Sequence, residues 1–134
     1  MKYIDHIGIA VKNLQESITV FENLLNTVCY KKELVMSEQV TTAFLKTGET
    51  KIELLQDEKE DGVINRFIAK KGEGIHHIAF EVENLQQEVA RLQQAGYVFL
   101  NEEPKKGADN KLICFLHPKS TNNVLIELCQ QISS

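Results

Sequence analysis

The stretch GIHHIAFEVENLQQ, residues 74–87, repeats the pattern of an earlier stretch, YIDHIGIAVKNLQE, residues 3–16. When His77 is aligned with His6, both stretches read His-Ile, a small residue, an apolar residue and a free position. Both then continue with Val, a charged residue and Asn-Leu-Gln. The same pattern at two places in a short chain indicates an internal repeat, which decides the fold.

Each half of the chain also closes on a matching segment. KIELLQ at residues 51–56 returns as LIELCQ at residues 125–130. The His-containing segment and the Ile-Glu-Leu segment keep their order in both halves. We therefore expect two copies of one structural unit, arranged in tandem.

The opening segment of each half alternates in the manner of a β-strand. Ile7, Ile9 and Val11 share one face, which places His6 on the opposite face. In both halves an Asn follows, three residues before a Glu or Gln, as at the N-terminus of a capped helix. Leucines and other apolar residues then recur at helical spacing. Each half therefore predicts a strand followed by a helix.

Strand-like runs follow each predicted helix. The sequence KTGETK, residues 46–51, predicts a hairpin, and Asn122-Asn123 predicts the corresponding turn in the second half. The fold class is therefore α+β, with two tandem βαβββ modules that form one curved mixed sheet with a concave metal-binding cleft. This single domain divides into module one at residues 1–57, a linker with a short helix at 58–72, and module two at 73–134.

The polar residues of the repeat indicate a metal site. Glu53 and Glu127 alternate with apolar residues, which places them on the face expected to carry His6 and His77. Imidazole nitrogens and carboxylate oxygens suit one borderline divalent ion, either Co²⁺, Mn²⁺, Ni²⁺ or Zn²⁺. Four ligands leave coordination positions open, as catalysis requires. His76 is out of register with His6, so we expect it outside the ligand set.

Composition narrows the class of protein. The chain has 134 residues and 43% hydrophobic residues, which fits one globular domain. Its net charge of −4 argues against general nucleic-acid binding. No apolar run is long enough for a membrane span and no signal peptide is evident, so we expect a cytoplasmic protein with no membrane partner. Reduced core thiols are expected at Cys29, Cys114 and Cys129.

On these motifs the chain resembles the vicinal oxygen chelate superfamily, and within it the methylmalonyl-CoA epimerase family. The resemblance covers nearly the whole chain, and its most specific segment is FLHPKSTNNVLIEL, residues 115–128. It implies a metal-dependent isomerase of propionate metabolism that interconverts the (R) and (S) forms of a CoA thioester at C2. It also implies one divalent ion as the cofactor, and we expect a homodimer. The ligands implied are His6, Glu53, His77 and Glu127.

The resemblance further implies two carboxylate bases, Glu38 and Glu127, one on each face of C2. Glu38 stands in MSEQVTTAF, where members of the family usually carry one more residue before the Val. His117 is either a structural turn residue or a substrate contact. Four lysines form either a solvated loop or a diffuse contact for CoA phosphates: Lys105, Lys106, Lys111 and Lys119.

Two other functions within the superfamily are alternatives to the epimerase. Glyoxalase I would use all four ligands on a hemithioacetal of glutathione. The HPKST segment and the scarcity of arginine, which occurs only as Arg66 and Arg91, favour the epimerase. A non-catalytic binding member of the superfamily commonly lacks the ligands. The sequence leaves open the native metal, the oligomeric state and whether modules pair within one chain or swap between chains.

Overall fold

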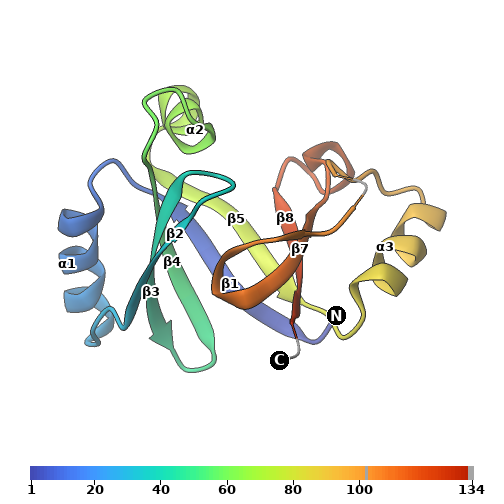
Figure 1. Cartoon of the computed structure of the whole chain (residues 1–134), viewed down its shortest axis with the longest axis horizontal. Helices are drawn as coiled ribbons and strands as arrows, with labels where there is room; N and C mark the ends of the chain where they lie inside the picture. Colours follow the sequence, from blue (N-terminus) through green and yellow to red (C-terminus); the bar gives the residue numbers. More distant parts are fainter. Residues whose placement is uncertain (102, 133–134) are drawn as a thin grey trace. The chain divides into compact units, whose positions relative to one another are not determined.

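The computed structural model describes residues 1–101 and 103–132. Its strands pair in the hydrogen-bonded order β2-β3-β4-β1-β5-β8-β7-β6. The predicted α+β class is therefore confirmed, with a mixed sheet and the two βαβββ repeats (Figure 1). The elements are β1 (Tyr3–Ala10), α1 (Leu14–Leu25), β2 (Lys31–Val35), β3 (Val40–Thr47), β4 (Thr50–Asp57), α2 (Val63–Lys71), β5 (Gly74–Glu81), α3 (Leu85–Gln94), β6 (Lys105–Lys106), β7 (Lys111–Phe115) and β8 (Ile126–Gln131), with short 3₁₀ turns at Ala108–Asn110 and Pro118–Ser120.

The chain packs as two compact units. One unit comprises residues 6–76, and the other comprises residues 1–5 with 77–134. Strands β1 and β5 contribute to both units, because each unit boundary falls inside one of them. The module boundaries that the sequence predicts, at residues 57 and 73, stay a prediction.

In the unit of residues 6–76, β4 runs parallel to β1 and antiparallel to β3, and β3 pairs with β2. Helix α1 packs against β3 and β4, as Figure 1 shows. The alternation of the strands directs one apolar set to this helix. Its buried members are Val11, Leu14, Ile18, Ala43, Leu45 and Leu54.

The opposite face of this sheet carries the polar residues, and α2 covers its end. Ile64 and Ile68 of α2 pack against Ala10, Val40 and Leu55. The sequence predicted the short helix correctly, and Gly72 ends it with a φ of 80°. The linker helix lies at this end of the sheet because its own buried side chains need an apolar surface.

The start of α2 depends on a carboxylate from β4. Asp57 Oδ2 accepts hydrogen bonds from the backbone N–H groups of Ile64 and Asn65, at 2.8 and 3.0 Å. The residue before the helix is Gly62, which has no side chain to act as a cap. A Cβ at Gly62 would lie 2.0 Å from Asp57 Oδ1, so glycine is required there.

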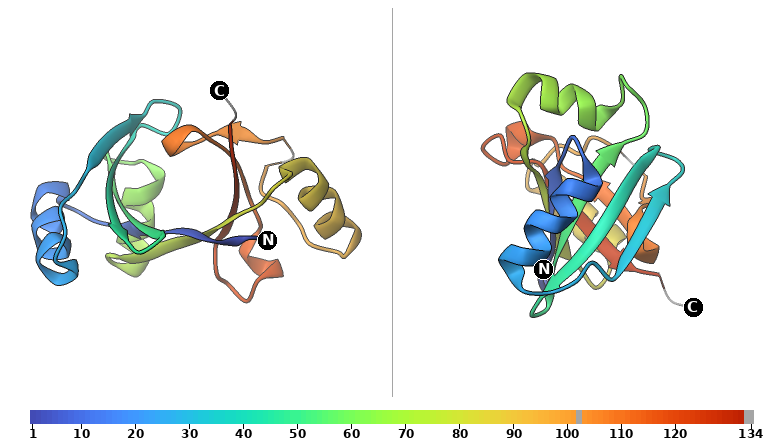
Figure 2. Two further views of the ribbon diagram at one scale, coloured as in Figure 1. Left: turned by 90° about the horizontal axis from the view of Figure 1, so that it is seen from below. Right: turned by 90° about the vertical axis from the view of Figure 1, so that its left-hand side faces the viewer.

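In the second unit, β5 runs parallel to β8, and β8 and β7 are antiparallel. Helix α3 contacts β8, and the left view of Figure 2 shows α3 on the outer side of the strands of this unit. The buried core between α3 and the strands consists of Val82, Leu85, Val89, Leu92, Cys114, Leu116 and Leu128.

The two repeat helices begin in the same way. Asn13 Oδ1 accepts from the backbone N–H of Glu16, and Asn84 Oδ1 accepts from that of Gln87, both at 3.0 Å. An N-cap side chain of this kind satisfies a backbone donor that the helix cannot. The helix starts predicted from the Asn residues are therefore confirmed.

A second cap comes from the closing strand of each repeat. Gln56 Oε1 accepts from the N–H of Leu14 at 2.6 Å, and Gln130 Oε1 accepts from the N–H of Leu85 at 2.7 Å. This explains why the Ile-Glu-Leu segments both end in Gln. Each glutamine ties the first turn of a helix to a strand that follows it by about 40 residues in the chain (|i−j| of 42 and 45).

The predicted turns are also present. Gly48 has a φ of 62° between β3 and β4, and Asn122 and Asn123 have φ values of 56° and 67° before β8. Asparagine tolerates this left-handed region better than most residues. In the part of the chain that the structure describes, no helix has the length and apolar character needed to cross a membrane.

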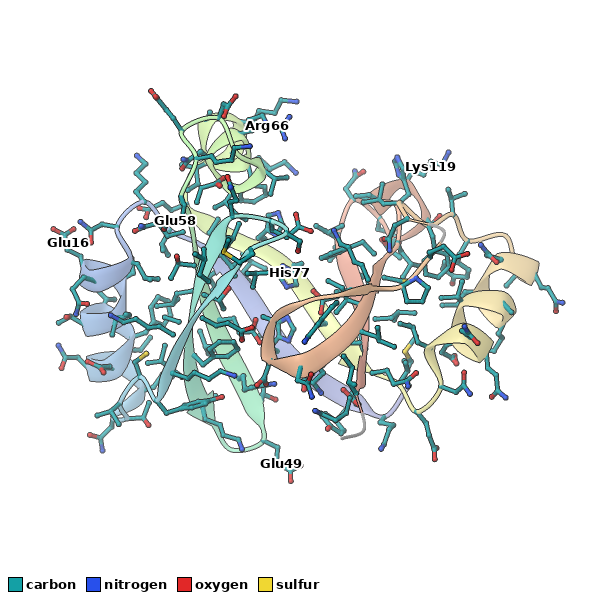
Figure 3. The ribbon with its side chains drawn as sticks, viewed as in Figure 1. Glu16, Glu49, Glu58, Arg66, His77 and Lys119 are labelled. Atoms are coloured by element: carbon teal, nitrogen blue, oxygen red, sulfur yellow. The ribbon has the colours of Figure 1, made fainter. Side chains whose placement is uncertain are left out.

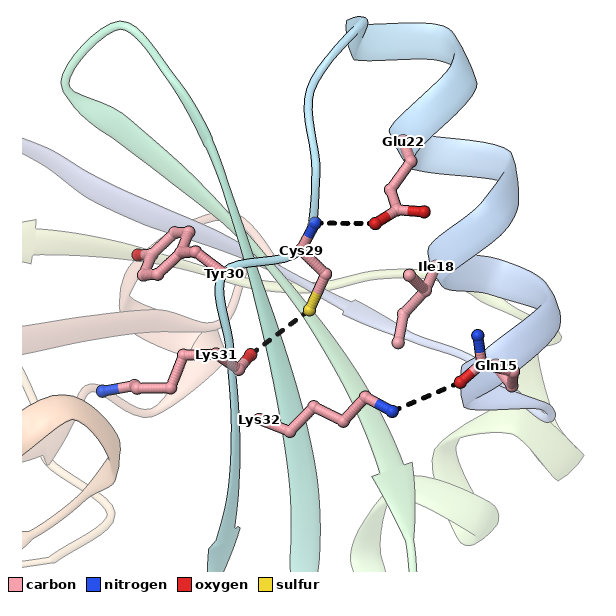
Figure 4. Close-up of a pocket in the computed structure, with 7 residues that line it drawn as sticks. All are labelled: Gln15, Ile18, Glu22, Cys29, Tyr30, Lys31 and Lys32. Atoms are coloured by element: carbon pink, nitrogen blue, oxygen red, sulfur yellow. Dashed lines mark hydrogen bonds between the residues drawn. The ribbon is translucent and has the colours of Figure 1, made fainter.

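All three cysteines are free thiols, and two of them lie in the core as predicted, Cys114 and Cys129. Cys29 is half-buried and lines a groove of about 320 Å³ between α1 and β2 (Figure 4). Its backbone N–H donates to Glu22 at 2.8 Å, and its thiol donates to the carbonyl of Lys31 at 3.3 Å.

Replacing either glutamine cap should destabilise the protein. Gln56→Ala and Gln130→Ala each leave one helix N–H without its acceptor, so each should lower the free energy of unfolding by about 1–2 kcal/mol. Urea denaturation followed by circular dichroism measures the change. Gln94→Ala, at an exposed position of α3, is the control and should stay within about 0.5 kcal/mol of the parent. Equal stabilities of all three variants would contradict the capping role.

Candidate functional site

The first His–Glu pair lies on β1 and β4. Because these strands are parallel and Gly8 pairs with Glu53, the side chains of His6 and Glu53 share one face. His6 Nδ1 lies 3.1 Å from Glu53 Oε2. The two residues are 5% and 3% exposed, so the polar atoms are almost fully removed from water.

The second pair repeats this arrangement on β5 and β8. These strands are also parallel, and Ala79 pairs with Glu127. His77 Nε2 lies 3.3 Å from Glu127 Oε1, and both residues are buried. Figure 3 shows His77 projecting from β5. Each half of the repeat therefore brings one imidazole and one carboxylate together, as the alternation of its strands predicts.

The neighbours of the two glutamates match as well. Glu53 pairs with Phe44 on its antiparallel side, and Glu127 pairs with Phe115 in the same way. The His77 ring meets the Phe115 ring edge to face, with centroids 5.7 Å apart. A small residue on one side and a phenylalanine on the other leave room for the His ring and exclude water from the pair.

The two phenylalanines were not predicted from the sequence. A signal was available, because Phe44-Leu45 and Phe115-Leu116 are separated by the same spacing as His6 and His77. Their role became visible only when the strand register placed each phenylalanine beside a glutamate.

Because each His–Glu pair is buried, its carboxylate loses hydration that a partner must replace. A carboxylate that leaves water loses hydration worth several kcal/mol unless a cation or hydrogen-bond donors compensate. At the two glutamates, an imidazole provides part of that compensation. The donor set of imidazole nitrogen and carboxylate oxygen is also one that divalent transition metals accept.

Glu38 lies in the turn that joins β2 to β3 and is half-buried. The N–H groups of Glu38 and Gln39 both donate to the carbonyl of Val35, and Gln39 adopts a left-handed φ of 53°. The N–H of Glu58 donates to the carbonyl of Gln39 at 2.9 Å, which fastens the turn to the end of β4. Among the described residues, no group of three potential ligands includes Glu38. The role of Glu38 as a base stays a prediction.

His76 has a different environment from His77. Its ring packs edge to face on the Phe67 ring of α2, with centroids 5.0 Å apart. Burial lowers the pKa of His76 to about 4, so the ring is neutral at pH 7. The contact with α2 gives His76 a packing role, consistent with its expected place outside the ligand set.

The four lysines of the second half do not form one group. Lys111 is buried and pairs with Glu81 at 2.6 Å and with Asp5 at 3.3 Å. Both sequence-based interpretations, a solvated side chain and a phosphate contact, are therefore wrong for Lys111. Exposed positions are occupied by Lys105, Lys106 and Lys119.

His117 serves the turn before β8. The ring atom Nδ1 of His117 accepts a hydrogen bond from the backbone N–H of Lys119 at 3.1 Å. The backbone N–H of His117 donates to the carbonyl of Val98 at 2.7 Å. Of the two sequence-based interpretations, the structure supports the structural one. The proton of the neutral ring is then on Nε2, because Nδ1 is an acceptor.

Comparison with known proteins gives a consistent set of relatives. Residues 5–115 match the model of the Glyoxalase/Bleomycin resistance protein/Dioxygenase superfamily. An uncharacterized protein of Bacillus subtilis, YqjC, is 36% identical over 130 residues, covering 97% of this chain and 93% of that protein. Ethylmalonyl-CoA/methylmalonyl-CoA epimerase of Cereibacter sphaeroides is 38% identical over 129 residues, covering 95% of this chain and 96% of that protein.

A solved structure is similar over nearly the full length. It is a variant of Streptomyces coelicolor methylmalonyl-CoA epimerase in complex with 2-nitronate-propionyl-CoA. The TM-score is 0.93 at 32% sequence identity, and the match covers 99% of both chains.

Substitution of the two adjacent histidines should separate their roles. His77→Ala should abolish binding of a divalent ion, because it removes the imidazole beside Glu127, whereas His76→Ala should retain the ion. Elemental analysis of folded, dialysed protein measures the metal content. Equal loss in both variants would show that the register derived from His6 is wrong.

Proposed function

The chain belongs to the Glyoxalase/Bleomycin resistance protein/Dioxygenase superfamily, and we propose that it is a metal-dependent epimerase that interconverts (R)- and (S)-methylmalonyl-CoA. One observation carries the metal-dependent part of the proposal: each repeat holds one buried imidazole against one buried carboxylate, at 3.1 and 3.3 Å. Two relatives that are similar along nearly the whole chain, one by sequence and one by structure, carry the name of this activity.

The two pairs fit the ligands of a divalent ion. Two donors that each bind an ion at about 2.1 Å lie about 3 Å apart when they subtend a right angle. The observed separations of 3.1 and 3.3 Å agree with that value. We propose that one ion is held by His6, Glu53, His77 and Glu127. The donors leave the choice among Co²⁺, Mn²⁺, Ni²⁺ and Zn²⁺ open.

The substrate determines what the site must do. C2 of methylmalonyl-CoA lies between a thioester and a carboxylate, so removal of its proton creates an enolate. A bound divalent ion would supply electrophilic stabilisation for that developing negative charge. The dry, phenylalanine-lined surroundings of Glu53 and Glu127 would strengthen every charge interaction with the substrate.

Inversion at C2 requires one group to take a proton from one face and a second to deliver a proton to the other. We assign these roles to Glu38 and Glu127. Glu38 stands on a turn whose backbone is fixed by three hydrogen bonds. Oε1 of Glu127 faces His77, so we assign the proton transfer to Oε2. The assignment is symmetric, because each enantiomer uses one base as proton acceptor and the other as donor.

The CoA part of the substrate brings phosphates. Lys105, Lys106 and Lys119 are exposed and give the second half local positive charge in an otherwise acidic chain. We propose that they make diffuse contacts with the nucleotide phosphates. Such contacts are sensitive to ionic strength, so KM for the CoA thioester should rise with salt.

The deciding experiment is proton exchange at C2. Protein loaded with Co²⁺ is incubated with racemic methylmalonyl-CoA in heavy water, and NMR follows loss of the C2 proton. Ethylmalonyl-CoA tests the wider acyl range that the Cereibacter sphaeroides relative's name includes. The hemithioacetal of methylglyoxal and glutathione tests the glyoxalase reaction. Turnover of the hemithioacetal without exchange at C2 would replace the epimerase proposal. Metal binding with neither reaction would favour a binding protein.

A homodimer stays a prediction. Sedimentation equilibrium of the metal-loaded protein should give twice the chain mass of 15.2 kDa. A species at the chain mass across the accessible concentrations would contradict it.

Glu38→Gln should separate catalysis from metal binding. Loss of a general base should lower turnover about 10²–10⁴-fold in both directions, equivalent to about 3–5 kcal/mol of transition-state stabilisation. Metal content and thermal stability should not change. Exchange of the C2 proton should persist for one enantiomer, because Glu127 alone can remove and return that proton on one face.

The matched control is Glu49→Gln, at the exposed tip of the β3–β4 hairpin (Figure 3). Like Glu38→Gln, it removes one carboxylate charge from the unit of residues 6–76, and it should keep parental turnover. A Glu38→Gln enzyme that also epimerises at the parental rate would exclude Glu38 from the mechanism.

A further inference from the structure

A buried cluster of charges lies in the unit that contains residues 1–5 and 77–134. Lys111 Nζ is 2.6 Å from Glu81 Oε1 and 3.3 Å from Asp5 Oδ1. All three residues are 4–5% exposed. A charged triad at this depth is unusual, because each ion loses several kcal/mol of hydration. The proposed reaction does not use these residues.

The cluster is closed by donors from β8. The backbone N–H of Gln131 donates to Glu81 Oε2 at 3.2 Å, and the thiol of Cys129 donates to Glu81 Oε1 at 3.6 Å. Burial raises the pKa of the Cys129 thiol, and the negative charge of Glu127 raises it further, so the thiol keeps its proton. Both oxygens of Glu81 are therefore occupied by donors from other strands.

Lys111 is charged despite its burial. Burial alone would lower its pKa, but the hydrogen bond to Glu81 and the charge of Asp5 together raise the pKa above its usual value. The ligand atoms of Asp5, Glu81 and Cys129 lie within 4.8 Å of one another, a spacing that suits a cation. In this cluster the ammonium group of Lys111 occupies the place of that cation.

The cluster adjoins the strands that carry three of the proposed ligands. Asp5 directly precedes His6 on β1, Glu81 ends the strand β5 that carries His77, and Cys129 follows Glu127 by two residues on β8. The backbone N–H of Lys2 also donates to the carbonyl of Glu81 at 2.8 Å. The side chain of Lys111, from β7, pairs with Asp5 of β1 and with Glu81 of β5.

We propose that Lys111 is a positioning residue for the metal centre, acting through Asp5 and Glu81 on the strands that carry His6, His77 and Glu127. The proposal rests on the proposed function for the existence of that centre. Without the ammonium group, Asp5 and Glu81 repel each other inside the protein, and β1 and β5 must shift or admit water to separate them. A shift of β1 at Asp5 displaces the adjacent His6.

Lys111→Met tests the proposal, because methionine fills a similar volume without charge. Apo-protein is titrated with Co²⁺ and followed by the visible absorption of the ion, which reports ligand geometry. The parent should bind one ion per chain. Lys111→Met should bind it about 10–100-fold more weakly, as when a group that orients a metal ligand is lost, and with an altered spectrum.

Val89→Ala is the control for lost stability. Val89 belongs to the hydrophobic core under α3 in the same unit, so this variant should melt at a lower temperature but keep parental Co²⁺ affinity and spectrum. Glu81→Gln is a milder second variant, since Lys111 keeps its pair with Asp5. It should weaken Co²⁺ binding by a smaller factor, and it serves as the test if Lys111→Met does not fold.

The outcomes distinguish the two proposals. A parent that binds no Co²⁺ would overturn the proposed metal-dependent function and this inference with it. If the parent binds one ion, and Lys111→Met or Glu81→Gln protein binds Co²⁺ with parental affinity and spectrum, the positioning role alone is overturned. Equal weakening by Val89→Ala would also overturn it, because general destabilisation would then explain the effect.

Discussion

The cost of burying a carboxylate is the constraint on which this structure depends. Glu53 and Glu127 are 3% and 4% exposed, and each faces an imidazole across about 3 Å. Such a group is stable only where the backbone brings a partner to it in a fixed geometry. Parallel pairing provides that geometry, because it puts the His of an opening strand and the Glu of a closing strand on one face.

Other features of each repeat follow from the same requirement. In both repeats a small residue, Gly8 or Ala79, pairs with the glutamate of the closing strand. The closing strand must also stay in register with the helix that precedes it. Gln56 and Gln130 meet that need, since each accepts the first N–H of its own helix. Strand register and helix position are therefore coupled through one side chain in each half.

The two repeats carry different residues at some matched positions. The buried triad around Lys111 lies in one unit, and Val40 occupies the position of Lys111 in the other repeat. The turn with Glu38 is shared by both repeats, because the N–H of Glu58 donates to the carbonyl of Gln39 and the N–H of Ile132 donates to that of Asn110. A duplicated chain can keep its common framework and specialise such positions separately. The candidate positioning residue Lys111 thus has no counterpart of the same chemistry in the opposite repeat, whereas the candidate base Glu38 corresponds to Asp109.

The sequence by itself determined the repeat, the α+β class, the helix starts at Asn13 and Asn84, and the pairing of a His with a Glu in each half. These features follow from residue periodicity and capping chemistry, which are local or repeat at a fixed spacing. Tertiary structure decided the rest. From the sequence, Lys111 is predicted to be a loop lysine, because its neighbours in the chain do not indicate its partners Glu81 and Asp5. Phe44 and Phe115 lie beside the glutamates only because of the strand register. Burial of a charge and the identity of its partner depend on contacts between residues distant in sequence, and a local pattern does not contain them.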